Sequence, residues 1–256
     1  MLDSHTLTQY RPQAESLRGH IILITGAGDG IGKSAALNFA RYGATIILVG
    51  KTLAKLEVVY DAIEAIDNSA TPAIFPLNLE SASEHDYTSM RDVLSKEFGH
   101  LDGILHNAGE LGPRTPIENY SAAAWQKVMQ VNVTAPFLMT KALLPLLKKS
   151  KHARIVFTGS SVGIKARAYW GAYAVSKAAT ENLMALLADE FEASDNIVFN
   201  SINPGGTRTS MRAAAYPAED PSTVSHPDEL MNRYLFLFSK ENNASNGQQF
   251  DAQPKN

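Results

Sequence analysis

Hydrophobic positions along the chain follow two alternating patterns, short continuous runs and longer repeats at helical spacing. The first run, Ile21 to Ile24, stops at Thr25 and Gly26 and predicts a strand that is buried on both faces. Apolar residues then recur at helical spacing from Ile31 to Tyr42, and Gly43 follows where a helix end favours glycine. The chain therefore opens with a strand, a glycine turn and a helix.

The same alternation continues to the end of the chain. We expect further strands at residues 44–49, 73–79, 103–107, 154–158, 197–202 and 248–251. We expect helices at residues 52–66, 84–98, 121–149 and 171–192, and one more before the last strand. Strands that alternate with helices predict an α/β fold, a doubly wound parallel sheet of about seven strands with helices on both faces.

The 256 residues contain no repeat or linker that would divide this pattern. We expect an N-terminal extension at residues 1–19, which are polar and aperiodic, and a single domain at residues 20–256. Within that domain, residues 207–226 lack clear periodicity and contain two prolines, Pro217 and Pro221. An irregular segment of this length in a compact fold predicts a lid or a substrate-binding loop.

Composition narrows the classes of partner. The net charge of -3 disfavours nucleic acid and anionic membranes as partners. The sequence contains no cysteine, which excludes disulfides and thiolate chemistry. The seven histidines do not have the spacing of metal ligands, so we assign no metal. The first twenty residues include no long apolar stretch, so we expect neither a signal peptide nor a membrane-spanning helix there. We therefore expect a cytoplasmic location.

The glycine turn after the first strand carries the first chemical signal. Residues 25–32 have the sequence TGAGDGIG, between a predicted strand and a predicted helix. Glycines let the backbone approach a pyrophosphate, whose charge is stabilised by the amides at the helix N-terminus. The alternative is a purely structural turn. If a dinucleotide binds, we expect contacts from Gly26, Gly28, Asp29, Gly30, Ile31 and Gly32.

The end of the second strand bears on the choice of nucleotide. An acidic residue there would bind the ribose hydroxyls of NAD and repel a 2′-phosphate, but this chain has Gly50, Lys51 and Thr52. NADP(H) is therefore favoured over NAD(H), with Lys51 facing the phosphate. Alternatively, Lys51 is only a solvent-exposed loop lysine. Lys33 is a second candidate for binding the 2′-phosphate.

A serine, a tyrosine and a lysine form the candidate catalytic centre. Tyr173 and Lys177 lie one helical turn apart, so the ammonium is expected to sit beside the phenol and lower its pKa from about 10. Such a phenol can exchange a proton with a carbonyl or alcohol oxygen. Ser160 ends the preceding strand and could bind the same oxygen, with Ser161 as the neighbouring alternative.

These motifs together resemble the short-chain dehydrogenase/reductase family, which uses a TGxxxGxG turn, a serine and a Tyr-x-x-x-Lys pair in this order. The resemblance covers residues 20 to about 252, and the chain is similar to a bacterial oxidoreductase subgroup of the family around Asn203 to Thr209. It implies a single Rossmann-type domain that moves hydride between NADP(H) and a carbonyl or secondary alcohol. It also implies a homodimer or homotetramer assembled through the helices at 121–149 and 171–192.

The resemblance implies further cofactor contacts. His106 stands in place of the first asparagine of the family's N-N-A-G segment, and we interpret it as structural. Asn78 stands where the family has an aspartate near the adenine. The contacts implied by these matches are Asn78, Leu79, Asn107, Ala108, Gly109, Tyr173, Lys177, Pro204, Gly205, Thr207 and Thr209.

Asn132 matches the asparagine that the family uses in its long central helix. Pro136 has no N–H, so the carbonyl of Asn132 lacks its usual i+4 donor and can accept another hydrogen bond. We hypothesise that this carbonyl holds a water that links Lys177 to solvent as a proton relay. A plain proline kink with a structural asparagine is the alternative.

Two other functions share parts of this pattern. An NADP(H) sensor would keep the fold without turnover, although it would need neither Ser160 nor the tyrosine and lysine. Sugar-nucleotide epimerases and dehydratases share the Tyr-x-x-x-Lys pair but have a different glycine spacing and an added substrate domain.

The substrate itself is not identified by the sequence. We expect its pocket between residues 111–117, 162–170 and 207–226, which follow strand ends. The arginines in these segments favour an acidic or phosphorylated substrate if they face the pocket, and otherwise are surface residues; they are Arg114, Arg167, Arg208 and Arg212.

Overall fold

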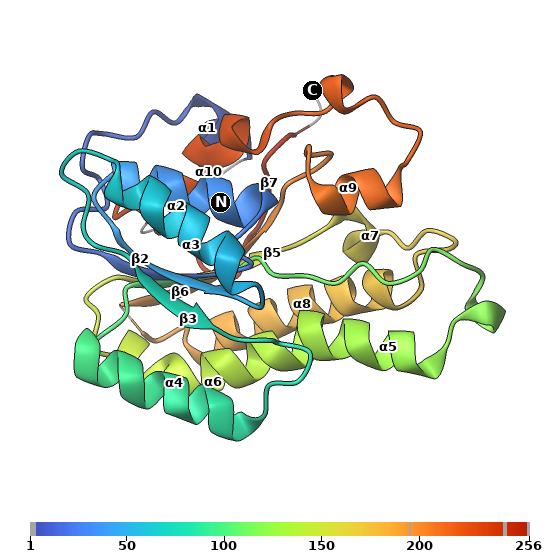
Figure 1. The fold of residues 1–256 in the computed structure, drawn as a ribbon, viewed down its shortest axis with the longest axis horizontal. Helices are drawn as coiled ribbons and strands as arrows, with labels where there is room; N and C mark the ends of the chain where they lie inside the picture. The colour runs from blue at the N-terminus through green and yellow to red at the C-terminus, as the bar shows by residue number, and fades with distance from the viewer. Residues whose placement is uncertain (1–3, 195, 243–244, 255–256) are drawn as a thin grey trace.

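The computed structural model describes residues 4–194, 196–242 and 245–254. A single sheet of parallel strands runs through the middle of the molecule in the order β3-β2-β1-β4-β5-β6-β7 (Figure 1). The strands are β1 (Ile21–Thr25), β2 (Thr45–Gly50), β3 (Ala73–Pro76), β4 (Gly103–His106), β5 (Ala153–Thr158), β6 (Ile197–Asn203) and β7 (Gln249–Asp251). Every neighbouring pair is parallel, so the predicted doubly wound α/β fold is confirmed.

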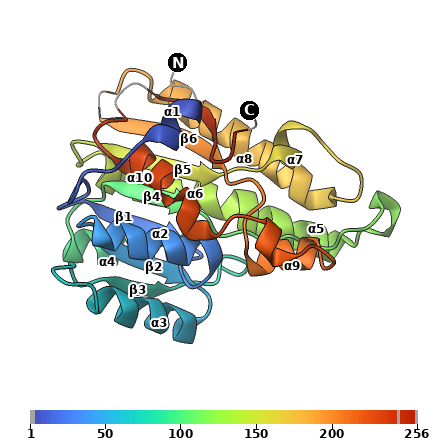
Figure 2. The same ribbon diagram turned by 90° about the horizontal axis from the view of Figure 1, so that it is seen from above.

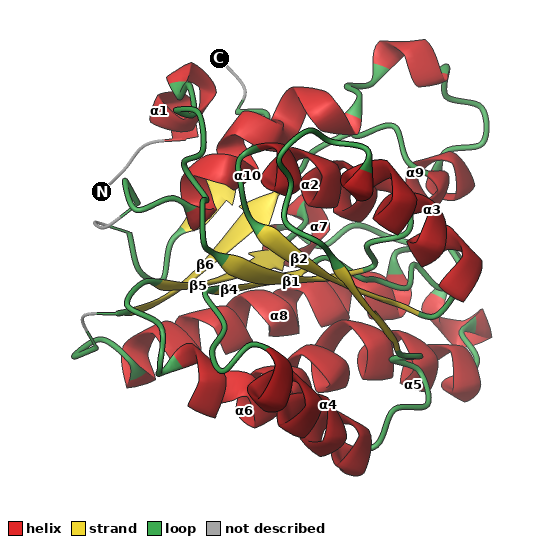
Figure 3. Ribbon diagram, turned by 60° about the vertical axis from the view of Figure 1, so that its left-hand side comes forward, coloured by secondary structure: helices red, strands yellow, loops and turns green. Residues whose placement is uncertain are grey.

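Helices cover both faces of the sheet, as Figure 3 shows. One face carries α1 (Ser4–Gln9), α2 (Gly30–Arg41), α3 (Leu53–Glu64) and α10 (Met231–Phe238). The other face carries α4 (Glu84–Glu97), α5 (Ala122–Met129), α6 (Ala135–Leu147) and α8 (Gly171–Glu190). The short helices α7 (Ser161–Ile164) and α9 (Ser210–Ala215) follow β5 and β6 and lie toward one end of the sheet (Figure 2). Single 3-10 turns occur at Ile117–Asn119, Pro221–Thr223 and Pro227–Leu230.

The core has two layers because successive residues of a strand point to opposite faces. In β1, Ile22 and Ile24 join the cluster under α2 and α10, whereas Leu23 joins the cluster under α4, α6 and α8. All three side chains are inaccessible to solvent. Burial of a side chain of this size contributes roughly 1.5–3 kcal/mol, which explains why the strands are continuous apolar runs. Within the described residues, no helix combines the length and the apolar character needed to cross a membrane.

The strand order reverses direction between β1 and β4, and this places a crevice at their carboxyl ends. The loops that follow the two strands are tied together there. The hydroxyl of Thr25 accepts hydrogen bonds from the backbone amides of Asn107 and Ala108, each at 3.0 Å. The glycine turn after β1 and the segment after β4 therefore form one rigid wall.

The helix predicted at residues 121–149 is not continuous. A π-helical turn, Gln130–Thr134, separates α5 from α6. Pro136 is the second residue of α6, just after this turn, and cannot donate the amide hydrogen that a regular α-helix requires at that point. The expected break in the hydrogen bonding is present, and the structure accommodates it as a wider turn.

Two other segments contain structure that was not predicted. Residues 207–226, predicted as an irregular loop, include α9, which is capped by the Thr209 hydroxyl accepting from the amide of Arg212 at 3.1 Å. A six-residue helix is too short to show a periodic pattern. Residues 4–9 form α1, and Leu7 and Leu17 are buried in the core beside α10, so this part of the N-terminal segment packs on the domain.

Candidate active site

The glycine turn between β1 and α2 has no room for side chains. Gly26 and Gly30 have positive φ angles of 68° and 50°, which glycine adopts without strain. A Cβ at Gly32 would overlap the carbonyl oxygen of Gly26 and would lie 2.6 Å from the side-chain nitrogen of Asn107. The turn therefore requires glycine for backbone packing, and the first residues of α2 line the crevice, where a helix N-terminus can bind an anion.

Asp29 connects this turn to two other elements. Its carboxylate accepts from the amide of Gly30 at 2.7 Å and caps α2. The same side chain pairs with the Lys55 ammonium of α3 at 3.0 Å and accepts from the Ser210 hydroxyl of α9 at 3.1 Å. The hydrogen bond with Lys55 is the main cause that lowers the pKa of Asp29. The mouth of the crevice is thus held by a polar bridge that involves α3 and α9.

A cleft of about 440 Å³ lies along the carboxyl edge of the sheet. Its wall includes the predicted residues of the glycine turn except Gly32, which is packed behind it, and Lys51 at the end of β2. Lys33 lies outside this cleft, in a separate hollow beside α9 and residues 224–228. The other predicted cofactor residues that line the cleft are Asn78, Leu79, Asn107, Ala108, Gly109, Tyr173, Lys177, Pro204, Gly205, Thr207 and Thr209.

Ser160, Tyr173 and Lys177 meet in the same cleft. Ser160 lies between β5 and α7, as the residue that precedes α7, while the tyrosine and the lysine lie one turn apart in α8. The ammonium of Lys177 donates to the carbonyl oxygen of Thr158 at 2.6 Å and lies 5.6 Å from the centre of the Tyr173 ring. Both side chains are buried at the base of the cleft, which is the position from which a proton can be delivered to a bound oxygen.

Burial controls the acidity of this pair. It raises the pKa of Tyr173 to about 12, and a hydrogen bond with Ser160 opposes the rise. Burial also lowers the pKa of Lys177 to about 8, and the charge of Glu181 opposes that change. The pKa of Tyr173 in the protein alone is therefore raised and not lowered as expected, because loss of water around the phenol is the largest effect on it.

Glu181 is a residue of this centre that we did not predict. It lies one helical turn beyond Lys177, it is buried, and its carboxylate accepts from the Ser201 hydroxyl of β6 at 2.5 Å. Burial raises the pKa of this carboxyl, and the charge of Lys177 opposes the rise. The sequence does contain a signal for this residue. Tyr173, Lys177 and Glu181 recur every four residues, which places all three side chains on one face of a helix.

Asn132 lies behind the cleft wall, within the π-helical turn. Its side chain accepts from the amide of Glu110 at 2.7 Å and donates to the carbonyl of Glu110 at 3.0 Å and to the Ser176 hydroxyl at 2.9 Å. Its backbone carbonyl accepts from the Thr180 hydroxyl at 3.1 Å. The carbonyl therefore does accept outside the helix, and its partner in the protein is a threonine that the sequence interpretation missed.

His106, the residue at the end of β4, is buried away from the cleft. It lies at hydrogen-bond distance from the Thr140 hydroxyl, 2.8 Å, and stacks on Phe157 with ring centres 4.8 Å apart. Burial lowers the pKa of His106 to about 3, so the ring is neutral. This environment supports its interpretation as structural. In the described part of the chain, no group of three or more histidine, aspartate or glutamate side chains is placed to hold a metal ion.

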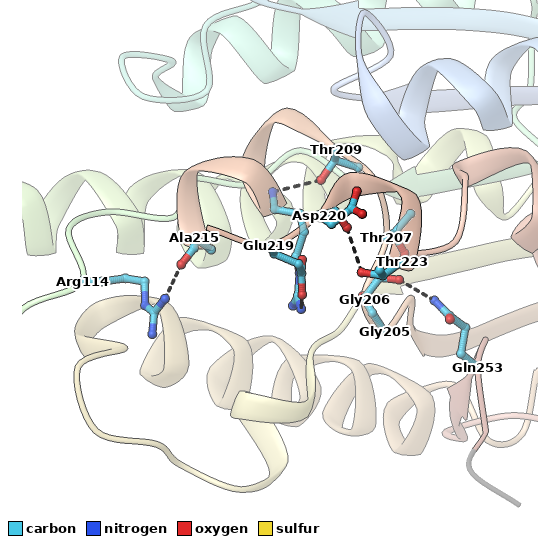
Figure 4. Close-up of polar contacts among 11 residues, drawn as sticks. Arg114, Gly205, Gly206, Thr207, Thr209, Ala215, Glu219, Asp220, Thr223 and Gln253 are labelled. Carbon is cyan, nitrogen blue, oxygen red and sulfur yellow. Dashed lines mark hydrogen bonds and ion pairs between the residues drawn. The ribbon is translucent and has the colours of Figure 1, made fainter. Parts of the chain in front are cut away.

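The turn after β6 is held by the end of the chain. Gly205 has a φ of 71°, and the side-chain amide of Gln253 donates to the carbonyls of Pro204 at 2.8 Å and Gly206 at 2.9 Å (Figure 4). Thr207 donates to the carbonyl of Pro204 at 3.2 Å. These bonds fix the turn against β7 and place its residues on the cleft wall.

Comparison with known proteins agrees with this geometry. The family described as short chain dehydrogenase matches residues 20–220. The chain belongs to this family. It is 46% identical to the uncharacterized oxidoreductase YciK of Escherichia coli K12 over 245 residues, which cover 96% of each protein.

Two solved short-chain dehydrogenases are similar over their whole length. One, from Shigella flexneri 2a and complexed with NADP, has 46% identity and a TM-score of 0.91 over 94% of this chain and 100% of that one. The other, from Escherichia coli CFT073 and complexed with NADPH, has 47% identity and a TM-score of 0.91 over 95% of this chain and 100% of that one. The predicted resemblance to the family is therefore confirmed.

The arginines in the substrate region of this short-chain dehydrogenase do not form an anion site. Of the four, only Arg212 lines the cleft, and Glu219 pairs with it through two hydrogen bonds of 2.6 and 2.5 Å. Arg114 donates to the carbonyl of Ala215, and Arg208 donates to the carbonyl of Val224 at 3.3 Å. These arginines therefore do not support an acidic or phosphorylated substrate.

Proposed function

We propose that this protein is an NADP(H)-dependent oxidoreductase that moves a hydride between the nicotinamide and a carbonyl or secondary alcohol substrate. The observation that carries the proposal is the meeting of Ser160, Tyr173 and Lys177 in the cleft that the glycine turn also lines. A nucleotide pocket alone would be compatible with a sensor. A buried phenol, hydroxyl and ammonium beside that pocket are the groups that carbonyl chemistry needs.

The cleft fits a phosphorylated dinucleotide. The glycine turn would hold the pyrophosphate at the start of α2, and Lys51 would hold the 2′-phosphate, since no carboxylate follows β2 there. The NADP and NADPH complexes of the similar enzymes support this choice over NAD(H). When bound, the cofactor supplies or accepts the hydride. Further contacts are proposed from Asn78, Leu79, Asn107, Ala108, Gly109, Pro204, Gly205, Thr207 and Thr209.

The residues of this chain would divide the proton chemistry. Tyr173 donates a proton to the carbonyl oxygen during reduction and accepts it during oxidation. Ser160 donates a hydrogen bond that holds the same oxygen in place. Lys177 stabilises the phenolate by its charge, and Asn132 positions α8 and a water at its carbonyl for proton exchange with solvent, beside the bond from Thr180.

The domain limits and the assembly also remain predictions. We propose one domain at residues 20–256, with residues 1–19 as an extension that packs against it. We propose a homodimer or homotetramer that assembles through the helices at residues 121–149 and 171–192, which are α5, α6 and α8. Phe137 of α6 and Val175 and Leu186 of α8 are exposed to solvent. If these side chains form one apolar patch, they would mark the interface between subunits.

Fluorescence titration with NADPH and NADH, together with reduction of a panel of aldehydes and ketones, tests the function. We expect tighter binding of NADPH and turnover of at least one carbonyl. Tight NADPH binding with no turnover by the wild-type protein would instead support the sensor. Tighter NADH binding would contradict the role given to Lys51.

A further inference from the structure

The substrate end of the cleft is built from apolar and aromatic side chains. A small core cluster surrounds Tyr173 and includes Val162, Trp170 and Ala215. Leu111, Met211 and Tyr216 pack against it from the loop after β4 and from α9. The members of this cluster that face the cleft are Leu111, Trp170, Tyr173, Met211, Ala215 and Tyr216.

Arg114 holds this wall together from outside the cleft. Its guanidinium lies 4.7 Å from the centre of the Trp170 ring and 4.9 Å from the centre of the Tyr216 ring. It also donates to the carbonyl oxygen of Ala215, as Figure 4 shows. The two ring centres are also only 6.0 Å apart, and a cation that packs beside both rings is attracted to each, so Arg114 connects the loop after β4 to α9 and to the residue that precedes α8.

Arg212 also packs on the Tyr216 ring. Its guanidinium lies 3.8 Å from the Tyr216 ring centre and forms the double hydrogen bond to Glu219. The hydrogen bond with Arg212 lowers the pKa of Glu219, which keeps this partner charged. The positive charge of Arg212 is therefore already balanced by a carboxylate where it reaches the cleft.

Most of the other charged side chains that line the cleft are paired with an opposite charge. Asp29 pairs with Lys55, while Glu80 and Glu110 both pair with Lys127 at 3.2 and 3.7 Å. Among the cleft-lining charges, Lys177 donates to a backbone carbonyl at the catalytic centre, and Lys51 lies at the nucleotide end. Of the described cations at the substrate end of the cleft, Arg212 is already paired with Glu219 and Lys177 belongs to the catalytic centre, so a carboxylate or phosphate on the substrate would lose water beside apolar side chains without a further cation to bind it.

We propose that the substrate is an uncharged carbonyl compound, or the matching alcohol, whose apolar or aromatic body binds against Trp170, Met211 and Tyr216. Arg114 is the positioning residue that keeps the two rings in place. This inference rests on the proposed oxidoreductase function and names its substrate class.

A pair of aldehydes of similar size tests the substrate class. The compounds are 4-isopropylbenzaldehyde and 4-carboxybenzaldehyde, which differ mainly in the charge of the para group. With NADPH we expect kcat/KM for the isopropyl compound to exceed that for the carboxylate at least about tenfold, because only the carboxylate must lose water around a charge. Equal values, or a preference for the carboxylate, would overturn the inference.

A binding measurement separates this inference from the proposed function. Calorimetry of the Tyr173→Phe variant saturated with NADPH reports affinity for both aldehydes without turnover. If the wild type reduces no carbonyl of the panel but the variant still prefers the isopropyl aldehyde, the oxidoreductase function fails while the preference of the cleft for uncharged apolar ligands stands. If the variant binds neither at millimolar concentration, or binds the carboxylate more tightly, the substrate class is wrong.

Substitution of Arg114 tests the positioning role. We expect Arg114→Leu to raise KM for 4-isopropylbenzaldehyde about tenfold, with a smaller change in kcat and an unchanged Kd for NADPH, because both rings lose the cation that packs on them. Arg114→Lys should recover part of the loss, and Arg167→Leu, at an exposed position of the same region, should have little effect. A KM unchanged in Arg114→Leu, or an equal loss of NADPH affinity, would contradict the role.

Discussion

The ammonium of Lys177 donates a hydrogen bond to the carbonyl oxygen of Thr158, 2.6 Å away. This contact joins the first half of α8 to the last residue of β5, and Ser160 follows two residues later. The lysine is thereby fixed beneath the Tyr173 ring instead of extending to solvent. The relative placement of the three proposed catalytic side chains therefore depends on how one helix docks on one strand.

Replacement of Tyr173 by phenylalanine tests the proposed proton donor. The change removes one hydroxyl from a buried ring, so we expect kcat for carbonyl reduction to fall by about 100-fold to 10,000-fold, the range for loss of a general acid. The Kd for NADPH and the melting temperature should change little. Retention of more than a tenth of the wild-type kcat would rule out the phenol as the essential acid.

Lys51 and Lys33 form a matched pair for the nucleotide preference. Lys51 lines the cleft and Lys33 does not. We expect Lys51→Ala to raise the Kd for NADPH about tenfold, equivalent to about 1.4 kcal/mol, and to leave NADH binding unchanged. Lys33→Ala should alter neither. Equal effects of the two substitutions in a fluorescence titration would place the 2′-phosphate elsewhere.

Glu181 should tune Lys177 through its charge. The carboxylate raises the lysine pKa, so Glu181→Gln should lower it further below the value of about 8. If reduction requires the ammonium, kcat/KM falls as pH rises through that pKa, and the fall should begin at lower pH in the variant. Glu181→Asp should retain more of the wild-type profile. If the alkaline fall of kcat/KM in Glu181→Gln occurs at the same pH as in the wild type, or at higher pH, Glu181 acts only in packing.

His106 should contribute to acid sensitivity. Its pKa is about 3 in the folded protein and 6.5 in the unfolded chain, so the unfolded state binds the extra proton as pH falls below 6.5. This linkage should lower the free energy of unfolding by about 2 kcal/mol between pH 7 and pH 5. Urea unfolding at both pH values should give a smaller pH dependence for His106→Asn than for the wild type. An identical dependence would mean that the ring is already charged when folded.

Local patterns were sufficient to predict most of the fold. Burial on both faces of a parallel sheet makes each strand a continuous apolar run, so the seven strands were recognisable one by one. The glycine turn and the pair Tyr173 and Lys177 were recognisable for a similar reason, since a tight turn and one helical turn are geometries set by neighbouring residues. Segments too short to complete a period, such as α1 and α9, were missed.

The sequence by itself therefore determined the order of strands and helices along the chain and the family. It also determined those site residues, such as Tyr173 and Lys177, whose relative position depends on a short spacing within one element. Only the tertiary structure decided which charges remain available in the cleft. Lys55 with Asp29, Glu219 with Arg212, and Ser201 with Glu181 come from different elements, and their partners depend on how helices and loops meet at the carboxyl edge of the sheet. Burial decided the rest, because the pKa of Tyr173 responds to the water removed around it, and packing in three dimensions alone sets that amount.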